Sequence, residues 1–114
     1  MKRITGLLVF NLLLTLSVAA AAADLRVRVF ERGGKAPLAG AAVCLGTAAN
    51  LDQFGSSRTD NEGYVIFTDV PRASLLVTAS MAGYQSGQER MITSTTNRLL
   101  VMTLTNGGGG PQCA

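Results

Sequence analysis

The segment from Arg58 to Pro71 constrains the fold more than any other part of the chain. It reads Arg-Thr-Asp-Asn-Glu-Gly-Tyr-Val-Ile-Phe-Thr-Asp-Val-Pro, so a polar turn that ends at Gly63 leads into alternating apolar and polar residues. Such alternation is typical of a strand with one buried face, and glycine suits a turn that needs a positive φ. We therefore expect a β-hairpin around residues 60–63, within an all-β module.

Short segments with the same alternation recur along the chain, separated by turn signals about every 8 to 12 residues. Together with the hairpin they give about seven expected strands. These strands are residues 25–31, 41–45, 56–59, 64–68, 74–80, 85–93 and 98–104. Two packed sheets allow the apolar positions of such strands to share one interior. We therefore expect an antiparallel Greek-key β-sandwich over residues 24–106.

Residues 1–23 have the order of a secretory signal peptide. Lys2 and Arg3 precede an almost unbroken apolar run over residues 6–18, and small residues follow up to Ala23. The run is shorter than the roughly 20 residues that a membrane-spanning helix needs, which argues against an anchor. We expect cleavage after Ala23, with cleavage one residue earlier as a near alternative. The mature protein would then lie in the periplasm or outside the cell, with no membrane span.

The charge of the mature chain argues against nucleic acid as a partner. Loss of Lys2 and Arg3 with the signal peptide lowers the formal net charge from +3 to +1. Lys35 is then the one remaining lysine. Nucleic-acid binding needs a basic face that displaces counterions, and a nearly neutral chain does not predict one.

Two cysteines, Cys44 and Cys113, favour a disulfide in an exported protein. A free thiol and a bridge between two molecules are the alternatives. Residues 107–114 form a tail that begins with four glycines, which would let Cys113 reach back to the outward side of the strand that carries Cys44. Closing so long a segment would stabilise the fold by about 4 kcal/mol in the chain-entropy account.

Several short motifs of this chain follow one another in the order of a known family. The motifs are residues 37–43, 59–67, 69–71, 77–79 and 83–84. In this order the chain resembles the carboxypeptidase regulatory-like domain, over roughly residues 25–105. The resemblance implies a transthyretin-like, also called prealbumin-like, β-sandwich. It also implies an accessory, adhesive or binding module of an exported protein, without catalytic activity.

The chain contains no histidine. This excludes Ser-His-Asp and Cys-His catalysis and every histidine-ligated metal centre. The hydroxyisourate hydrolases, intradiol dioxygenases and copper proteins with related sandwiches depend on histidine, so we expect none of their activities. We expect no enzyme, no cofactor and no metal. The cluster Asp60, Asn61 and Glu62, with Asp52 and Asp69, could bind calcium, but turn formation explains residues 60–63 more simply.

Related pilin repeats carry a crosslink between a first-strand lysine and an asparagine. In this chain the first strand carries Arg26 and Arg28, and Lys35 lies in the turn that follows. An arginine side chain does not form that bond. We therefore expect no isopeptide crosslink.

Two functions are compatible with these observations. The first is protein–protein interaction with another envelope or secreted protein, in which the polar strand 85–93 could offer an open edge. The alternative is a carbohydrate-binding module, because similar sandwiches bind glycans. Phe54, in the loop before residue 56, and Tyr84 are the predicted binding residues. Each also has a packing explanation, as a ring that closes one end of the core.

Overall fold

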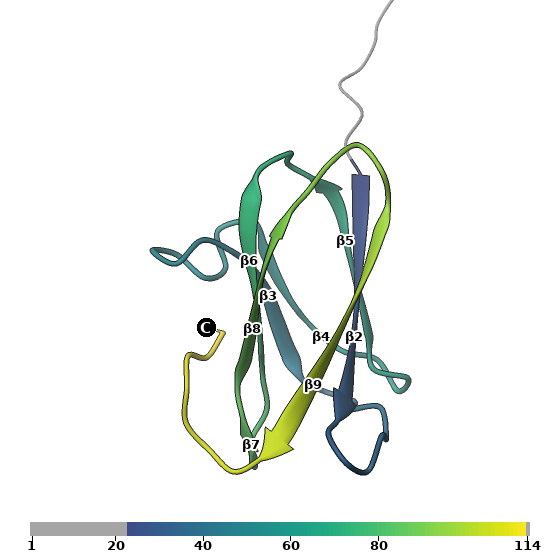
Figure 1. Ribbon diagram of the computed structural model, residues 1–114, viewed down its shortest axis with the longest axis vertical. Helices are drawn as coiled ribbons and strands as arrows, with labels where there is room; N and C mark the ends of the chain where they lie inside the picture. The colour runs from purple at the N-terminus through teal and green to yellow at the C-terminus, as the bar shows by residue number, and fades with distance from the viewer. Residues whose placement is uncertain (1–22, 114) are drawn as a thin grey trace, which may run out of the picture.

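The computed structural model describes residues 23–113, which form two four-stranded sheets packed face to face (Figure 1). The strands are β2 (Ala23–Glu31), β3 (Ala42–Gly46), β4 (Gly55–Arg58), β5 (Tyr64–Val70), β6 (Ser74–Ser80), β7 (Tyr84–Gln85), β8 (Gly87–Ile92) and β9 (Arg98–Asn106). The first sheet has the order β5-β2-β9-β7 and the second the order β4-β3-β6-β8. The predicted all-β sandwich is confirmed. The expected signal peptide lies outside the described residues, except for Ala23 at the start of β2.

Most of the core consists of alternate residues along the strands, whose side chains point inward. From the first sheet these are Leu25, Val27, Val29, Val65, Phe67, Met102 and Leu104, and from the second Val43, Leu45, Leu75, Val77 and Ala79. Most are aliphatic, so the two sheets pack closely without a large aromatic centre. Burial of this apolar surface provides the main driving force for folding.

The turn at residues 60–63 forms as predicted, but the expected hairpin was wrong. The Asp60 carboxylate accepts hydrogen bonds from the backbone N–H groups of Glu62 and Tyr64, at 2.8 and 2.9 Å, and Gly63 has a φ of 85°. However, β4 pairs with β3, whereas β5 pairs with β2. The turn therefore carries the chain from one sheet to the other. Its residues specify the turn, but they do not specify the strand with which β5 pairs.

The strand pairs are antiparallel except for β2 and β9, which run parallel from Leu25 beside Arg98 to Glu31 beside Leu104. The connection after β8 brings the chain back to the end of the sandwich at which β2 begins. There the Asn97 side chain accepts a hydrogen bond from the Asp24 backbone N–H at 2.9 Å. Because β9 starts beside the start of β2, the two strands point the same way.

The expected strand 85–93 is divided between the two sheets. Tyr84–Gln85 pairs with β9, whereas Gly87–Ile92 pairs with β6 as the edge strand of the second sheet. The chain changes sheet at Ser86. Gly87 allows this because a Cβ atom there would lie only 3.2 Å from the Leu104 side chain.

The predicted bridge between Cys44 and Cys113 is present, with a Cα–Cα distance of 5.7 Å and a sequence separation of 69. It fastens the C-terminal tail against the outward side of the second sheet, where the Cys113 sulfur lies 3.3 Å from the carbonyl oxygen of Thr78. The tail also accepts a hydrogen bond at the Gly109 carbonyl from the Ser86 N–H, at 3.1 Å. Cys44 and Thr78 are consequently fully buried although they point away from the core.

We predict that replacing both cysteines by alanine lowers the free energy of unfolding by up to about 4 kcal/mol, because the unfolded chain regains the entropy of an open loop. Urea denaturation of the wild type and of the Cys44→Ala, Cys113→Ala variant measures the difference. A reductant should shift the wild-type midpoint by a similar amount and leave that of the variant unchanged. Equal midpoints for wild type and variant would show that the bridge does not stabilise the fold.

We also predict that Gly63→Ala destabilises the fold more than Gly40→Ala. Both glycines have positive φ, 85° and 80°, so each substitution carries about 1 kcal/mol of backbone strain. A Cβ on Gly63 would also lie 2.7 Å from the Val29 carbonyl oxygen, whereas one on Gly40 would meet nothing within 4 Å. Thermal unfolding of the two variants compares them directly. Equal losses of melting temperature would mean that β2 can move away from a Cβ atom at position 63 at little cost.

Candidate functional site

The outward side of β5, β2 and β9 carries large apolar side chains that the core does not use. Ile66, Leu99 and Val101 are 57%, 53% and 53% exposed. The strand register places Arg26 between Ile66 and Leu99, and Arg28 between Tyr64 and Val101. Phe30 follows on the same side of β2, beside Thr103. We call these residues the outer patch: Arg26, Arg28, Phe30, Tyr64, Ile66, Leu99 and Val101.

The two arginines of the outer patch lie over its aromatic rings. The guanidinium carbon of Arg26 is 4.8 Å from the centre of the Tyr64 ring. That of Arg28 is 4.5 Å from the Tyr64 ring and 4.7 Å from the Phe30 ring. Each such contact contributes about 0.5–1 kcal/mol at an exposed site. These contacts give the guanidinium groups defined positions along the middle of the patch.

The turn at residues 60–63 also positions Arg28, whose Nε donates a hydrogen bond to the Glu62 carbonyl oxygen at 2.9 Å. A guanidinium group has five N–H donors, and Nε is the only one of Arg28 with a hydrogen bond among residues 23–113. The other donors of Arg28 are therefore available to an acceptor on a ligand. Arg26 donates no hydrogen bond within residues 23–113, so all five of its N–H donors are available.

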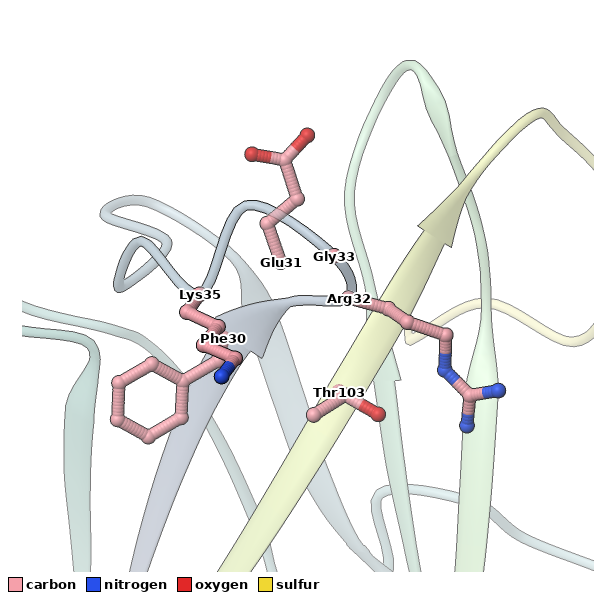
Figure 2. Close-up of a pocket in the computed structure, with 6 residues that line it drawn as sticks. All are labelled: Phe30, Glu31, Arg32, Gly33, Lys35 and Thr103. Atoms are coloured by element: carbon pink, nitrogen blue, oxygen red, sulfur yellow. The ribbon is translucent and has the colours of Figure 1, made fainter.

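The outer patch continues into a hollow of about 390 Å³ at the end of β2. The hollow is lined by Phe30, Glu31, Arg32, Gly33, Lys35 and Thr103. In Figure 2, Phe30 and Lys35 lie on one side, Arg32 lies on the other, and Glu31 points away from them. Lys35 has a φ of 61°, which a residue with a side chain rarely adopts. A tight turn imposes it, in which the Lys35 N–H donates to the Glu31 carbonyl at 2.9 Å.

The structure does not bring the two predicted binding residues together with this surface. Tyr84 is partly buried and packs against the core cluster, as the packing explanation expected. Its burial, and the nearby Glu31 carboxylate, raise the pKa of the Tyr84 hydroxyl above its ordinary value. Phe54 is 38% exposed and belongs to the connection between β3 and β4, in the other sheet. Binding by Tyr84 or Phe54 stays a prediction.

Sequence reasoning missed the outer patch because it used the apolar residues of each strand only to locate the core. The signal was present in two runs that are apolar at consecutive positions, Val65–Phe67 and Leu99–Met102. A strand with one buried face needs apolar residues only at alternate positions. The extra residues in these runs, Ile66, Leu99 and Val101, are the exposed ones.

Two further observations concern metals and membranes. Across residues 23–113, no group of three or more acidic or cysteine side chains is placed to hold a metal ion. The Asp60 carboxylate accepts hydrogen bonds from two backbone N–H groups of its own turn. In the same part of the chain we find no helix with the length and apolar character to span a membrane.

No family model and no curated protein matches this chain. Solved structures share its fold at low sequence identity. The pilus 2b backbone protein of group B streptococcus has a TM-score of 0.64 and 14% identity, over 79% of this chain and 43% of that one. The 5-hydroxyisourate hydrolase of Klebsiella pneumoniae has a TM-score of 0.60 and 14% identity, over 81% and 94%. The hydroxyquinol 1,2-dioxygenase of Pseudomonas putida DLL-E4 has a TM-score of 0.63 and 11% identity, over 79% and 58%.

These likenesses show a prealbumin-like β-sandwich, as the family resemblance implied. They do not identify the carboxypeptidase regulatory-like family itself. This chain spans less than half of the pilus protein. Such low identities transfer no activity from any of these proteins.

The expectation that the chain is not an enzyme is corrected by the same comparison. It was drawn partly from a resemblance to accessory modules, yet a hydrolase and a dioxygenase share the fold. A fold alone does not determine function, because catalytic groups are added to a common scaffold. The absence of histidine still excludes mechanisms that need histidine, but it does not exclude catalysis as such.

The turn beside the outer patch should make stability depend on pH. Hydrogen bonds from the Tyr64 and Glu62 N–H groups, together with the charge of Arg28, hold the pKa of Asp60 below its ordinary value. A carboxylate with a lowered folded pKa stabilises the fold above its unfolded pKa of about 3.9, and this contribution is lost as the pH falls through the folded pKa. We predict that wild-type melting temperature falls more steeply below about pH 4 than that of Asp60→Asn. Parallel curves would exclude this role of the carboxylate.

Proposed function

We propose that this chain is an exported accessory or structural module that binds another protein through the outer patch. The observation that carries the proposal is the exposure of Ile66, Leu99 and Val101 on one side of one sheet. Large apolar side chains exposed together on one side of a folded domain mark interaction surfaces. Covering them would contribute about 25 cal/mol for each Å² removed from water.

Export is part of the same proposal. Residues 1–23 have the composition of a signal peptide, with cleavage near Ala23, and would leave a sandwich over residues 24–106 and a tail over residues 107–114. The bridge from Cys44 supports an oxidising location, because disulfides persist in the periplasm and outside the cell. Pilus proteins with this fold add support for a structural or accessory role.

A protein partner is favoured over a carbohydrate at the outer patch, because the aromatic rings there are covered. Sugar binding relies on exposed rings that stack on the sugar. On the outer patch, Tyr64 and Phe30 are already covered by guanidinium groups. Tyr84 packs against the core. The exposed aliphatic side chains suit the apolar core of a protein interface and offer no hydrogen bonds to sugar hydroxyls.

The proposal predicts where a partner can be crosslinked in the cells that produce this protein. A photo-crosslinking amino acid at Val101 should give one discrete adduct with another protein, because this position is exposed on the outer patch beside Arg28. The same amino acid at Ile92, which is 73% exposed on β8 in the other sheet, is the matched control and should give none. Immunoblotting followed by mass spectrometry identifies the adduct.

A second variant tests whether the apolar contact matters. Val101→Gln should abolish an adduct formed from a probe at Leu99, whereas Ile92→Gln should leave it unchanged. An adduct of equal yield at Val101 and Ile92, or none at either outer-patch position, would overturn the proposed function.

A further inference from the structure

We infer that the partner presents an extended acidic segment to the outer patch, with carboxylates over the row of arginines and apolar side chains on either side. The inference rests on the proposed function and specifies the chemistry of the partner. Its basis is the arrangement of charge along β2 and the turn that follows.

Four cations are concentrated in residues 26–35, and they belong to one continuous surface. Arg26 and Arg28 lie in the middle of the outer patch, and Arg32 and Lys35 line the hollow at its end. A partner must therefore bring negative charge to this line. A neutral partner would have to strip water from the arginines without giving them an acceptor.

The carboxylates of residues 23–113 do not neutralise this row. The charge of Arg28 lowers the pKa of Asp60, so these two groups interact. However, one oxygen of the Asp60 carboxylate already accepts two backbone hydrogen bonds. Glu62 contributes its backbone carbonyl to Arg28. Glu31 points away from the cations of the hollow (Figure 2). The remaining N–H donors of the arginines are left for an external acceptor.

The spacing of the cations suits an extended chain. Residues two apart in a strand are separated by about 6.6–7 Å and share one side of the sheet. Arg26, Arg28 and the hollow beside Phe30 follow one another at this interval along β2. An extended segment above β2 repeats its side chains at the same interval, so acidic residues at alternate positions would meet all three. Ile66, and Leu99 with Val101, flank this line on the neighbouring strands.

Two other occupants fit less well. A second copy of this chain would place its own row of arginines against Arg26 and Arg28, and like charges in contact are unfavourable. An acidic polysaccharide would satisfy the arginines, but it offers no apolar groups to Ile66, Leu99 and Val101. Both are outcomes that the experiment below can detect.

Selection from a random peptide library displayed on phage tests the inference with the purified, disulfide-bonded protein. Enriched peptides should carry aspartate or glutamate at alternate positions, together with aliphatic or aromatic residues. Amide chemical shifts recorded on adding one such synthetic peptide should change along β2 and β9. Affinity should fall as salt is raised, because exposed charge pairs are screened.

Matched variants separate the arginine row from the net charge. Arg26→Gln with Arg28→Gln should weaken peptide binding about tenfold, the combined effect of two exposed ion pairs. Arg72→Gln with Arg90→Gln removes the same charge from exposed positions outside the outer patch and should leave affinity unchanged. Arg26→Lys with Arg28→Lys keeps the charge but loses the planar stacking group, so its affinity should lie between the two. Melting curves verify that each variant is folded.

Three results would overturn the inference. One is the enrichment of neutral or basic peptides; another is equal loss of affinity in the two glutamine variants. The third is binding of polyglucuronate, or self-association in sedimentation, that depends on Arg26 and Arg28 while no acidic peptide binds. If the crosslink at Val101 forms but acidic peptides are not selected, the proposed function stands and the acidic partner does not. If acidic peptides bind elsewhere, on β8 for instance, the acidic partner is ruled out for the outer patch, and the crosslink at Val101 alone decides the proposed function.

Discussion

The alternation of β2 is the constraint on which the rest of the structure depends. Its inward residues, including Val27 and Val29, are fully buried, while its outward residues, Arg26 and Arg28, form the middle of the outer patch. Because side chains alternate with a period of two, a slip of one residue would put both arginines into the core. The register is fixed beside the turn at Gly63, whose carbonyl accepts a hydrogen bond from the Val29 N–H at 2.9 Å. One strand register therefore determines the interior and the candidate binding surface together.

The two sheets follow the same alternation yet differ in how much of their outward sides is exposed. On the second sheet the tail and its bridge lie across the outward side, so that Cys44 and Thr78 are fully buried. On the first sheet the outward residues Ile66 and Val101 are more than half exposed. The disulfide thus has a consequence beyond stability. The disulfide holds the tail against the outward side of the second sheet. The outward side of the first sheet, with its exposed apolar residues, is left available for binding.

Much of this fold could be predicted from sequence, because the relevant information was local. Alternation located the strands, and Asp60 with Gly63 identified a turn that forms as expected. Strand pairing could not be predicted, because the residues near the turn do not determine whether β5 pairs with β2 or with β4. The outer patch was missed for a related reason. Alternation places Val101 on the outward side of its strand, but whether another segment covers that side is decided by contacts distant in sequence.

The stacking of arginine on aromatic rings changes the character of the outer patch from purely apolar to partly charged. Tyr64 and Phe30 would otherwise enlarge the apolar patch, but the guanidinium groups cover them and place positive charge at its centre. Two copies of the surface repel each other, whereas an oppositely charged partner is attracted and oriented. Stacking also restricts the arginine side chains before binding, so less conformational entropy is lost when a carboxylate arrives. The same contacts therefore discriminate against the wrong partner and prepare the surface for an acidic one.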